Sequence, residues 1–225
     1  MSIKHPIISV TGSSGAGTST VKHTFQQIFR RESVKAATLE GDAFHRYNRK
    51  EMKKELEKRH AAGDATFSHF SFDANLLPEL EDCFRNYSQQ GTCRYRHYIH
   101  NSNEENLYGA KPGNFTKWKK FEEPSDLLFY EGLHGAVVNE EINLARYADL
   151  KIGVVPVINL EWIQKIHRDT DSRGYSTEAV TDTILRRMHA YVHCICPQFT
   201  ETDINFQRVP VVDTSNPLVA RWIPT

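Results

Sequence analysis

The chain has 225 residues, of which 39% are hydrophobic and 25% are charged, and its 28 Lys and Arg balance its 28 Asp and Glu. This composition predicts one globular domain over residues 1–225 and excludes a disordered tail protein. A neutral chain lacks the basic surplus of a nucleic-acid-binding protein, and no apolar run is long enough to cross a membrane. The N-terminus lacks the pattern of a signal peptide, so we expect a cytoplasmic protein whose four cysteines are reduced.

The hydrophobic pattern predicts strands and helices that alternate along the chain. Apolar runs bounded by turn residues indicate buried strands, and apolar residues spaced by three and four indicate amphipathic helices. A polar stretch with glycines and prolines, at 101–125, is typical of a long loop that carries function. The alternation predicts an α/β fold in which helices cover both faces of a mostly parallel sheet. The expected strands are 6–11, 34–39, 93–100, 127–130, 150–157 and 209–212, and the expected helices are 21–29, 45–62, 76–88, 159–169 and 177–195.

A glycine-rich segment joins the first expected strand to the first expected helix. Residues 12–19 match the phosphate-loop pattern G-x-x-x-x-G-K-[ST], except that Thr18 replaces the lysine. Backbone N–H groups and a helix N-terminus can hold phosphate oxygens there, and the Ser19 hydroxyl can bind Mg²⁺. A plain glycine-rich turn that caps the helix is an alternative. Two other glycine motifs are excluded: a nucleophile elbow would need glycine in place of Ala16, and a dinucleotide-binding motif would need glycine in place of Thr20. The candidate nucleotide-binding residues are Gly12, Ser13, Ser14, Gly15, Ala16, Gly17, Thr18, Ser19 and Thr20.

A phosphate loop without its lysine needs another cation to balance the phosphate charge. In a helix, Lys165, Arg168 and Asp169 share one face, and Arg173 follows in a polar turn. This pattern predicts that residues at about 165–176 form a cationic lid over the phosphates. The alternative is a solvent-exposed helix face with ion pairs.

Polar residues that could bind a second substrate follow the second expected strand. Asp42 stands where a carboxylate could take a proton from an acceptor hydroxyl, or could instead cap the next helix. His45, Arg49 and Lys53 are spaced by four residues, which predicts a stripe of donors on one helix face, suited to a phosphate ester. Glu131 ends the fourth expected strand, where phosphate-loop proteins hold Mg²⁺. Alternate residues of the third expected strand share one face, which could bind a sugar or could simply face solvent. They are Arg94, Arg96, Tyr98 and His100.

Several longer segments carry a family resemblance. They are 5–18, 40–46, 129–135, 154–165 and 206–210. On these segments the chain resembles the bacterial phosphoribulokinases of the phosphoribulokinase and uridine kinase family, which also have threonine in the phosphate loop. The resemblance implies a phosphate-loop NTPase fold, the use of ATP and Mg²⁺, and phosphoryl transfer to O1 of ribulose 5-phosphate, a step of carbon fixation in the Calvin cycle.

The resemblance also implies roles for single residues. Asp42 matches the catalytic base, Lys165 the cation that replaces the loop lysine, and Asp169 a carboxylate needed for turnover. Ser19 and Glu131 match the magnesium site. The positions that match contacts to the sugar phosphate or to the transferred phosphoryl group are His45, Arg49, Lys53, Tyr98, His100, Arg168 and Arg173.

The family further implies a homo-oligomer and, in bacterial members, activation by NADH, with Arg31 and Arg187 as candidate effector contacts. Bacterial members usually run past the position where this sequence stops, so we expect a short member or one without the C-terminal strands. Two alternatives are a related kinase of uridine or pantothenate and a non-catalytic nucleotide sensor. The stripe at His45, Arg49 and Lys53 disfavours a neutral acceptor, because its donors would go unpaired.

Overall fold

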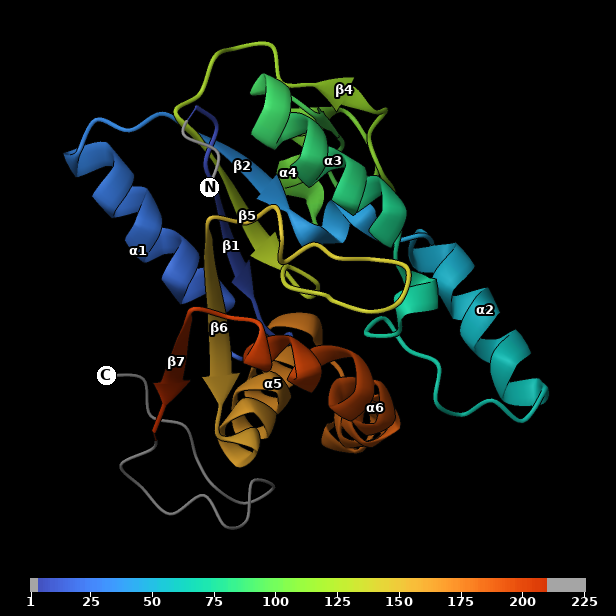
Figure 1. Ribbon diagram of the computed structural model, residues 1–225. Coiled ribbons are helices and arrows are strands. Elements are labelled where there is room, and N and C mark those ends of the chain that lie inside the picture. The colour runs from blue at the N-terminus through green and yellow to red at the C-terminus, as the bar shows by residue number, and fades with distance from the viewer. Residues whose placement is uncertain (1–3, 210–225) are drawn as a thin grey trace.

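A five-stranded sheet forms the centre of the molecule (Figure 1). The computed structural model describes residues 4–209, apart from the side chains of Pro156, Ser172, Arg173 and Arg208. The strand order is β2-β5-β1-β6-β7, and all four neighbouring pairs are parallel, which confirms the predicted α/β fold. The strands are β1 (Ile7–Thr11), β2 (Ala36–Glu40), β5 (Leu127–Gly132), β6 (Leu150–Pro156) and β7 (Ile204–Arg208).

Helices flank this sheet on both sides, with α1 on one side and α3 on the other (Figure 1). They supply the crossovers that parallel strands require. The α5 and α6 helices lie together beside the carboxyl ends of the strands. The helices are α1 (Thr18–Arg31), α2 (Arg49–Ala61), α3 (Leu77–Gln90), α4 (Ser102–Tyr108), α5 (Ile158–Arg173) and α6 (Thr177–Ala190).

Successive side chains of β5 pack on opposite faces of the sheet, which explains why this strand is an uninterrupted apolar run. Phe129 contacts Phe25 and Phe29 of α1, with ring centroids 5.3 and 5.6 Å apart. On the other face, the Tyr130 ring lies 5.3 Å from Phe84 of α3. The central residues of β5, Leu128, Phe129 and Tyr130, are therefore buried, and this packing holds the carboxyl end of the strand under the site described below.

The α2 helix begins four residues later than predicted. The side chain of Asn48 accepts hydrogen bonds from two N–H groups of the first turn, and the Glu51 carboxylate accepts one from the Asn48 N–H, all at 2.9 Å. This capping box starts the helix at Arg49 and leaves His45 outside it. The prediction that His45, Arg49 and Lys53 form a stripe on one helix face is therefore wrong, because the cap at Asn48 starts the helix after His45.

The predicted strand at 93–100 is mostly irregular. Only Arg94–Tyr95 forms a strand, β3, and it pairs antiparallel with β4 (Lys119–Lys120) in a separate sheet. The segment 101–125 is correspondingly not a simple loop, since it contains both α4 and β4. Its polar composition hid these elements because α4 is short and has no buried residue.

Two arginines of the 93–100 segment, Arg94 and Arg96, contact neighbouring parts of the protein instead of forming an open sheet face. The Arg96 guanidinium donates to the carbonyl oxygens of Ala43 and His45, at 2.7 Å each, and lies 3.6 Å over the Phe115 ring. Burial lowers the pKa of Arg96 to about 10. The Arg94 guanidinium lies over the ring of Trp118, 5.7 Å from its centroid. Their alternation with Tyr98 therefore reflects tertiary contacts and not a regular strand.

The C-terminal elements also differ from the prediction. The α5 helix continues to Arg173 and ends at Gly174, which has a φ of +70°, so all but the last residue of the polar turn predicted over 170–174 is helical. After α6 the chain forms a π-helical turn, Tyr191–Ile195, and a 3-10 turn. Most of the strand predicted at 209–212 lies outside the described residues, and the last described strand is β7.

The cysteines were predicted to be reduced, and for one pair this is wrong. Cys83 and Cys93 form a disulfide with their Cα atoms 4.9 Å apart, whereas Cys194 and Cys196 are free. The turn at Gly91, which has a φ of +71°, ends α3 and brings the chain back beside Cys83. No helix in the described part of the chain is both long and apolar enough to span a membrane.

Candidate active site at the carboxyl ends of the strands

The predicted phosphate loop joins β1 to α1, as the motif requires. Gly15 and Gly17 have φ values of +110° and +103°, which glycine adopts without a steric cost. A Cβ atom at Gly12 would lie 2.9 Å from Thr18 Cγ2 and 3.0 Å from the Val154 carbonyl oxygen. The loop therefore packs tightly against β6, with the N-terminus of a fourteen-residue helix behind it. This arrangement suits an anion.

A buried hydrogen bond ties the phosphate loop to α5. The Ser13 hydroxyl donates to Oε2 of Glu161 at 2.6 Å, and both side chains are buried. Burial raises the pKa of Glu161 to about 7, although the Ser13 hydroxyl opposes the shift. The prediction missed Glu161. Its position four residues before Lys165, on the same helix face, was the available signal.

Lys165, Arg168 and Asp169 lie together on α5, as predicted. Lys165 Nζ donates to Asp169 Oδ2 at 2.7 Å, and Arg168 Nε donates to Asp169 Oδ1 at 2.9 Å. Arg168 Nη2 also reaches Ser14 Oγ of the phosphate loop at 3.3 Å. The side chains of Lys165 and Asp169 are each only 7% exposed, so a solvent-exposed face is excluded for them. The side chain of Arg173 lies outside the described residues.

The charges of this cluster shift two pKa values. Desolvation and the nearby Arg187 lower the pKa of Lys165 to about 8, although Asp169 opposes the shift. Burial would raise the pKa of Asp169, but the hydrogen bonds from Lys165 and Arg168 outweigh it and lower that pKa. Near neutral pH the cluster therefore consists of the protonated amine of Lys165 and the guanidinium of Arg168, both hydrogen-bonded to the carboxylate of Asp169, beside the phosphate loop.

Asp42 lies between two imidazole rings in the 3-10 turn Gly41–Phe44, directly after β2. Its Oδ1 is 3.2 Å from His45 Nε2, and its Oδ2 is 3.4 Å from His100 Nε2. Desolvation would raise the pKa of Asp42, but the charge and hydrogen bond of His45, with His100, hold it far below its usual range. Asn48, and not Asp42, caps α2, so the capping alternative is wrong.

Other candidate acceptor contacts gather around this carboxylate. The Tyr98 ring lies 5.0 Å from the His100 ring and 6.1 Å from the His45 ring. Arg49 Nη2 donates to the His100 carbonyl oxygen at 3.3 Å. The structure therefore brings all of these residues together, although they come from three separate segments. Lys53 is exposed one turn further along α2.

Two carboxylates end adjacent strands near the start of α1. Glu131 of β5 and Glu40 of β2 are direct partners in the sheet register. Lys22 of α1 forms an ion pair with Glu40. Burial raises the pKa of Glu131, while the Thr18 hydroxyl and Lys22 lower it. With the exposed hydroxyl of Ser19 in the first turn of α1, these oxygen donors fit Mg²⁺, which usually keeps water and phosphate as its other ligands.

The two candidate effector arginines lie on different helices. Arg31 is the last residue of α1 and forms an exposed ion pair with Glu32 at 2.8 Å. Arg187 of α6 lies 3.4 Å from His69 Nδ1 and 5.4 Å over the Phe70 ring. The segment around His69 was not singled out in the sequence, because no motif marks a polar loop that becomes buried by tertiary contacts.

Comparison with known proteins decides the family. The model of the phosphoribulokinase / uridine kinase family matches residues 7–215. The chain belongs to this family. It is 74% identical to phosphoribulokinase 1 of Cereibacter sphaeroides, over 100% of this chain and 78% of that protein. It is 67% identical to the phosphoribulokinase of Nitrobacter vulgaris, over 99% of this chain and 77% of that protein.

Comparison with solved structures agrees with this assignment. The chain is 72% identical to a phosphoribulokinase from Rhodobacter spheroides, with a TM-score of 0.87, over 99% of this chain and 76% of that chain. A possible uridine kinase from Bacillus stearothermophilus, 12% identical with a TM-score of 0.55 over 90% and 88% of the two chains, shares the fold alone. The resemblance inferred from the sequence segments and the phosphate-loop kinase fold are therefore confirmed.

Proposed function

We propose that the protein transfers the γ-phosphoryl group of ATP to O1 of ribulose 5-phosphate and releases ribulose 1,5-bisphosphate and ADP. The observation that carries the proposal is the Asp42 carboxylate, which lies between two imidazole rings at a strand end of a phosphate-loop kinase fold. Relatives named phosphoribulokinase are 58–74% identical over nearly the whole chain, which supports the choice of acceptor.

On the nucleotide side, the backbone of the phosphate loop holds the ATP phosphates at the N-terminus of α1. Ser19 and Glu131 hold Mg²⁺. When bound, this ion neutralises charge on the β- and γ-phosphates. The residues assigned to the nucleotide are Gly12, Ser13, Ser14, Gly15, Ala16, Gly17, Thr18, Ser19 and Thr20.

On the α5 side, Lys165 and Arg168 balance the charge that spreads over the transferred phosphoryl group, in place of the missing loop lysine. Asp169 fixes both cations through its two oxygens. The pKa of Lys165 lies near 8, so its amine is protonated at neutral pH. Residues 165–176 form a lid that excludes water which would otherwise hydrolyse ATP. Arg173 adds a cation at the end of this helix.

On the acceptor side, Asp42 accepts the proton of the O1 hydroxyl as that oxygen attacks phosphorus in line. Its low pKa keeps it ionised and ready to accept. The cationic and hydrogen-bonding groups around it bind the sugar and its phosphate. They are His45, Arg49, Lys53, Tyr98 and His100.

The acceptor is tested by ATP consumption with ribulose 5-phosphate, uridine, pantothenate or no acceptor, in the parent protein and in Asp42→Asn. We expect turnover with ribulose 5-phosphate and a loss of at least about a hundredfold in the variant, because general-base catalysis contributes on that order. Turnover with uridine or pantothenate instead would refute the assignment of ribulose 5-phosphate as the acceptor. Binding of ATP without any turnover would favour a nucleotide sensor.

We further propose that the protein is a single-domain, cytoplasmic homo-oligomer that NADH activates, with Arg31 and Arg187 as effector contacts. The support is the family membership and the exposed position of Arg31 at the end of α1. Sedimentation of the purified protein measures the oligomeric state. Initial rates with and without NADH, in the parent and in Arg31→Ala, test the effector site. A rate that NADH does not change would refute it.

A further inference from the structure

Asn75 makes contacts that fix the orientation of its side-chain amide. It is 3% exposed and directly follows the 3-10 turn Phe72–Ala74. Its Nδ2 atom lies 2.9 Å from the His69 carbonyl oxygen and 2.8 Å from the Ser71 carbonyl oxygen. Because carbonyl oxygens only accept hydrogen bonds, the NH₂ group must face them. The amide oxygen of Asn75 therefore faces the other way, toward His45, and lies 2.8 Å from its Nδ1.

The ring of His45 thus lies between two acceptors. An amide oxygen of Asn75 faces Nδ1, and a carboxylate oxygen of Asp42 lies 3.2 Å from Nε2. A neutral imidazole has one N–H and one lone pair, so in either tautomer one nitrogen would oppose an acceptor with a lone pair. Only the imidazolium donates from both nitrogens. The geometry therefore selects the charged form of His45.

We propose that Asn75 is a positioning residue that keeps His45 doubly protonated and aims its charge at the acceptor beside Asp42. This inference rests on the proposed function in one respect, namely that the acceptor is a phosphate ester. A cationic His45 attracts the negative charge of such a ligand, whereas a neutral ring does not, although both of its N–H groups already face Asn75 and Asp42. Asn75 itself acts only through His45.

The other groups around His45 support this state. Burial lowers the pKa of both His69 and His134 to about 3, so they stay neutral near pH 7 and do not repel the imidazolium. Desolvation opposes protonation, and so to a smaller extent does the Arg187 charge, but Asp42 and Asn75 outweigh them and raise the pKa of His45. The titratable and charged groups that face the ring from the elements around it are Asp42, His69, Tyr98, His134 and Arg187.

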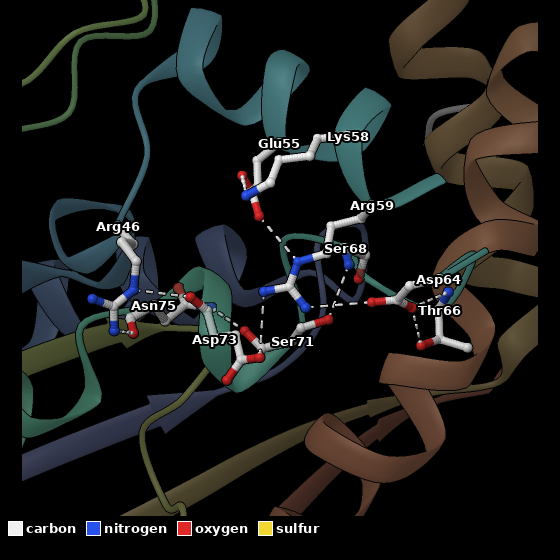
Figure 2. A network of polar contacts seen from close by, with 10 residues as sticks. All are labelled: Arg46, Glu55, Lys58, Arg59, Asp64, Thr66, Ser68, Ser71, Asp73 and Asn75. Atoms are coloured by element: carbon white, nitrogen blue, oxygen red, sulfur yellow. Dashed lines mark hydrogen bonds and ion pairs between the residues drawn. The ribbon is translucent and has the colours of Figure 1, made fainter. Parts of the chain in front are cut away.

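The loop that carries Asn75 is anchored by charged groups (Figure 2). Arg46 donates to the Asp73 carbonyl oxygen at 2.9 Å and to the Asn75 carbonyl oxygen at 3.3 Å. On the far side, Arg59 lies 3.4 Å from a carboxylate oxygen of Asp64 and 3.7 Å from one of Asp73. These contacts hold Asp73 within the 3-10 turn and the backbone of Asn75 directly after it, so they help to keep the amide oxygen directed at His45.

The first test is the titration of His45 by NMR on the full chain labelled in its histidine rings, without substrate. His45→Asn assigns the resonance. In Asn75→Ala we expect the pKa of His45 to fall by about one unit or more, because a hydrogen bond to the charged form is lost. In Asn75→Asp the carboxylate still accepts from Nδ1, so the pKa is expected to stay or rise. An unchanged pKa in Asn75→Ala, or a fall in Asn75→Asp, would overturn the proposal.

A matched control loosens the same loop without touching His45. The Ser71 hydroxyl accepts a hydrogen bond from the Ser68 N–H at 2.9 Å. Ser71→Ala removes this bond, so we expect an unchanged pKa of His45. If Ser71→Ala lowers that pKa as much as Asn75→Ala does, general loosening of the loop explains the effect and the proposal is wrong.

Kinetics provide the second test. One pH unit above the lowered pKa, KM for ribulose 5-phosphate in Asn75→Ala is expected to be about fivefold higher than in the parent at the same pH, with kcat nearly unchanged, because about one ring in ten stays charged in the variant and about half do in the parent. In a His45→Asn background the same substitution should leave KM unchanged. An equal KM effect in both backgrounds would overturn the proposal. Absence of turnover in the parent protein would refute the proposed function instead, and the titration, which uses no substrate, would still decide the role of Asn75.

Discussion

Replacement of Lys165 by methionine separates the charge of this side chain from its packing. Burial of the amine and the nearby Arg187, opposed by Asp169, lower its pKa from 10.5 to about 8, which corresponds to a net cost of about 3 kcal/mol for the charged amine in the folded protein. The substitution relieves this cost but removes one cation from the buried Asp169, which keeps its hydrogen bond from Arg168 at 2.9 Å. Because the two effects oppose each other, we expect the free energy of unfolding to change by less than about 2 kcal/mol.

The effect on turnover should be much larger. Removal of one preorganised charge partner of the transferred group usually costs about 3–4 kcal/mol in the transition state, so kcat is expected to fall on the order of 10²–10³-fold. The assay is ADP release at saturating ATP and acceptor, with urea unfolding of the same preparations to measure stability.

Lys151→Met is the matched control for this substitution. Lys151 also forms an ion pair with an aspartate, Asp203, at 3.0 Å, but it lies near the amino end of β6, away from the phosphate loop. We expect the control to keep its kcat within about twofold. If Lys165→Met retained full turnover, or if Lys151→Met lost as much, the assignment of Lys165 as the cation that replaces the loop lysine would be refuted.

Two further predictions follow from the same site. Gly12→Ala should raise KM for ATP at least about tenfold, because its Cβ would lie 2.9 Å from Thr18 Cγ2 and 3.0 Å from the Val154 carbonyl oxygen, and the loop must move. An unchanged KM would contradict the close packing. Since the protonated amine of Lys165 is lost as pH rises through about 8, kcat should fall above that pH, and Lys165→Arg should move the fall to higher pH. Initial rates between about pH 6 and 10 check this, and an alkaline limb at the same pH in both proteins would contradict it.

Local signals were enough to predict one half of the site. The phosphate loop follows β1 and Glu131 lies at the carboxyl end of β5, and a strand end defines a place in a parallel sheet before any tertiary contact is known. Lys165, Arg168 and Asp169 were predicted together because helical spacing alone places them on one face. In each case the geometry is set within one element and its immediate neighbour.

The other half depends on contacts that no spacing rule describes. His45 was predicted on a helix, but the cap at Asn48 excludes it, and its partners come from distant segments: Asn75 lies 30 residues away along the chain. Glu161 reaches Ser13 across 148 residues. These side chains are polar and buried, and their pairing is decided by how the loops pack, so the sequence contains no periodicity that identifies them.

The position of Lys165 on α5 links phosphate binding to the placement of that helix. Two other side chains of α5 hold the phosphate loop, Glu161 through Ser13 and Arg168 through Ser14. They lie four residues before and three residues after Lys165, so on a helix they stand on the same face and on either side of it. In the usual motif the lysine belongs to the loop and moves with it. In the proposed mechanism the cation comes from a separate helix, and the two hydrogen bonds keep that helix in register with the loop. We therefore expect any change that loosens them to weaken the contact of Lys165 with the phosphates as well.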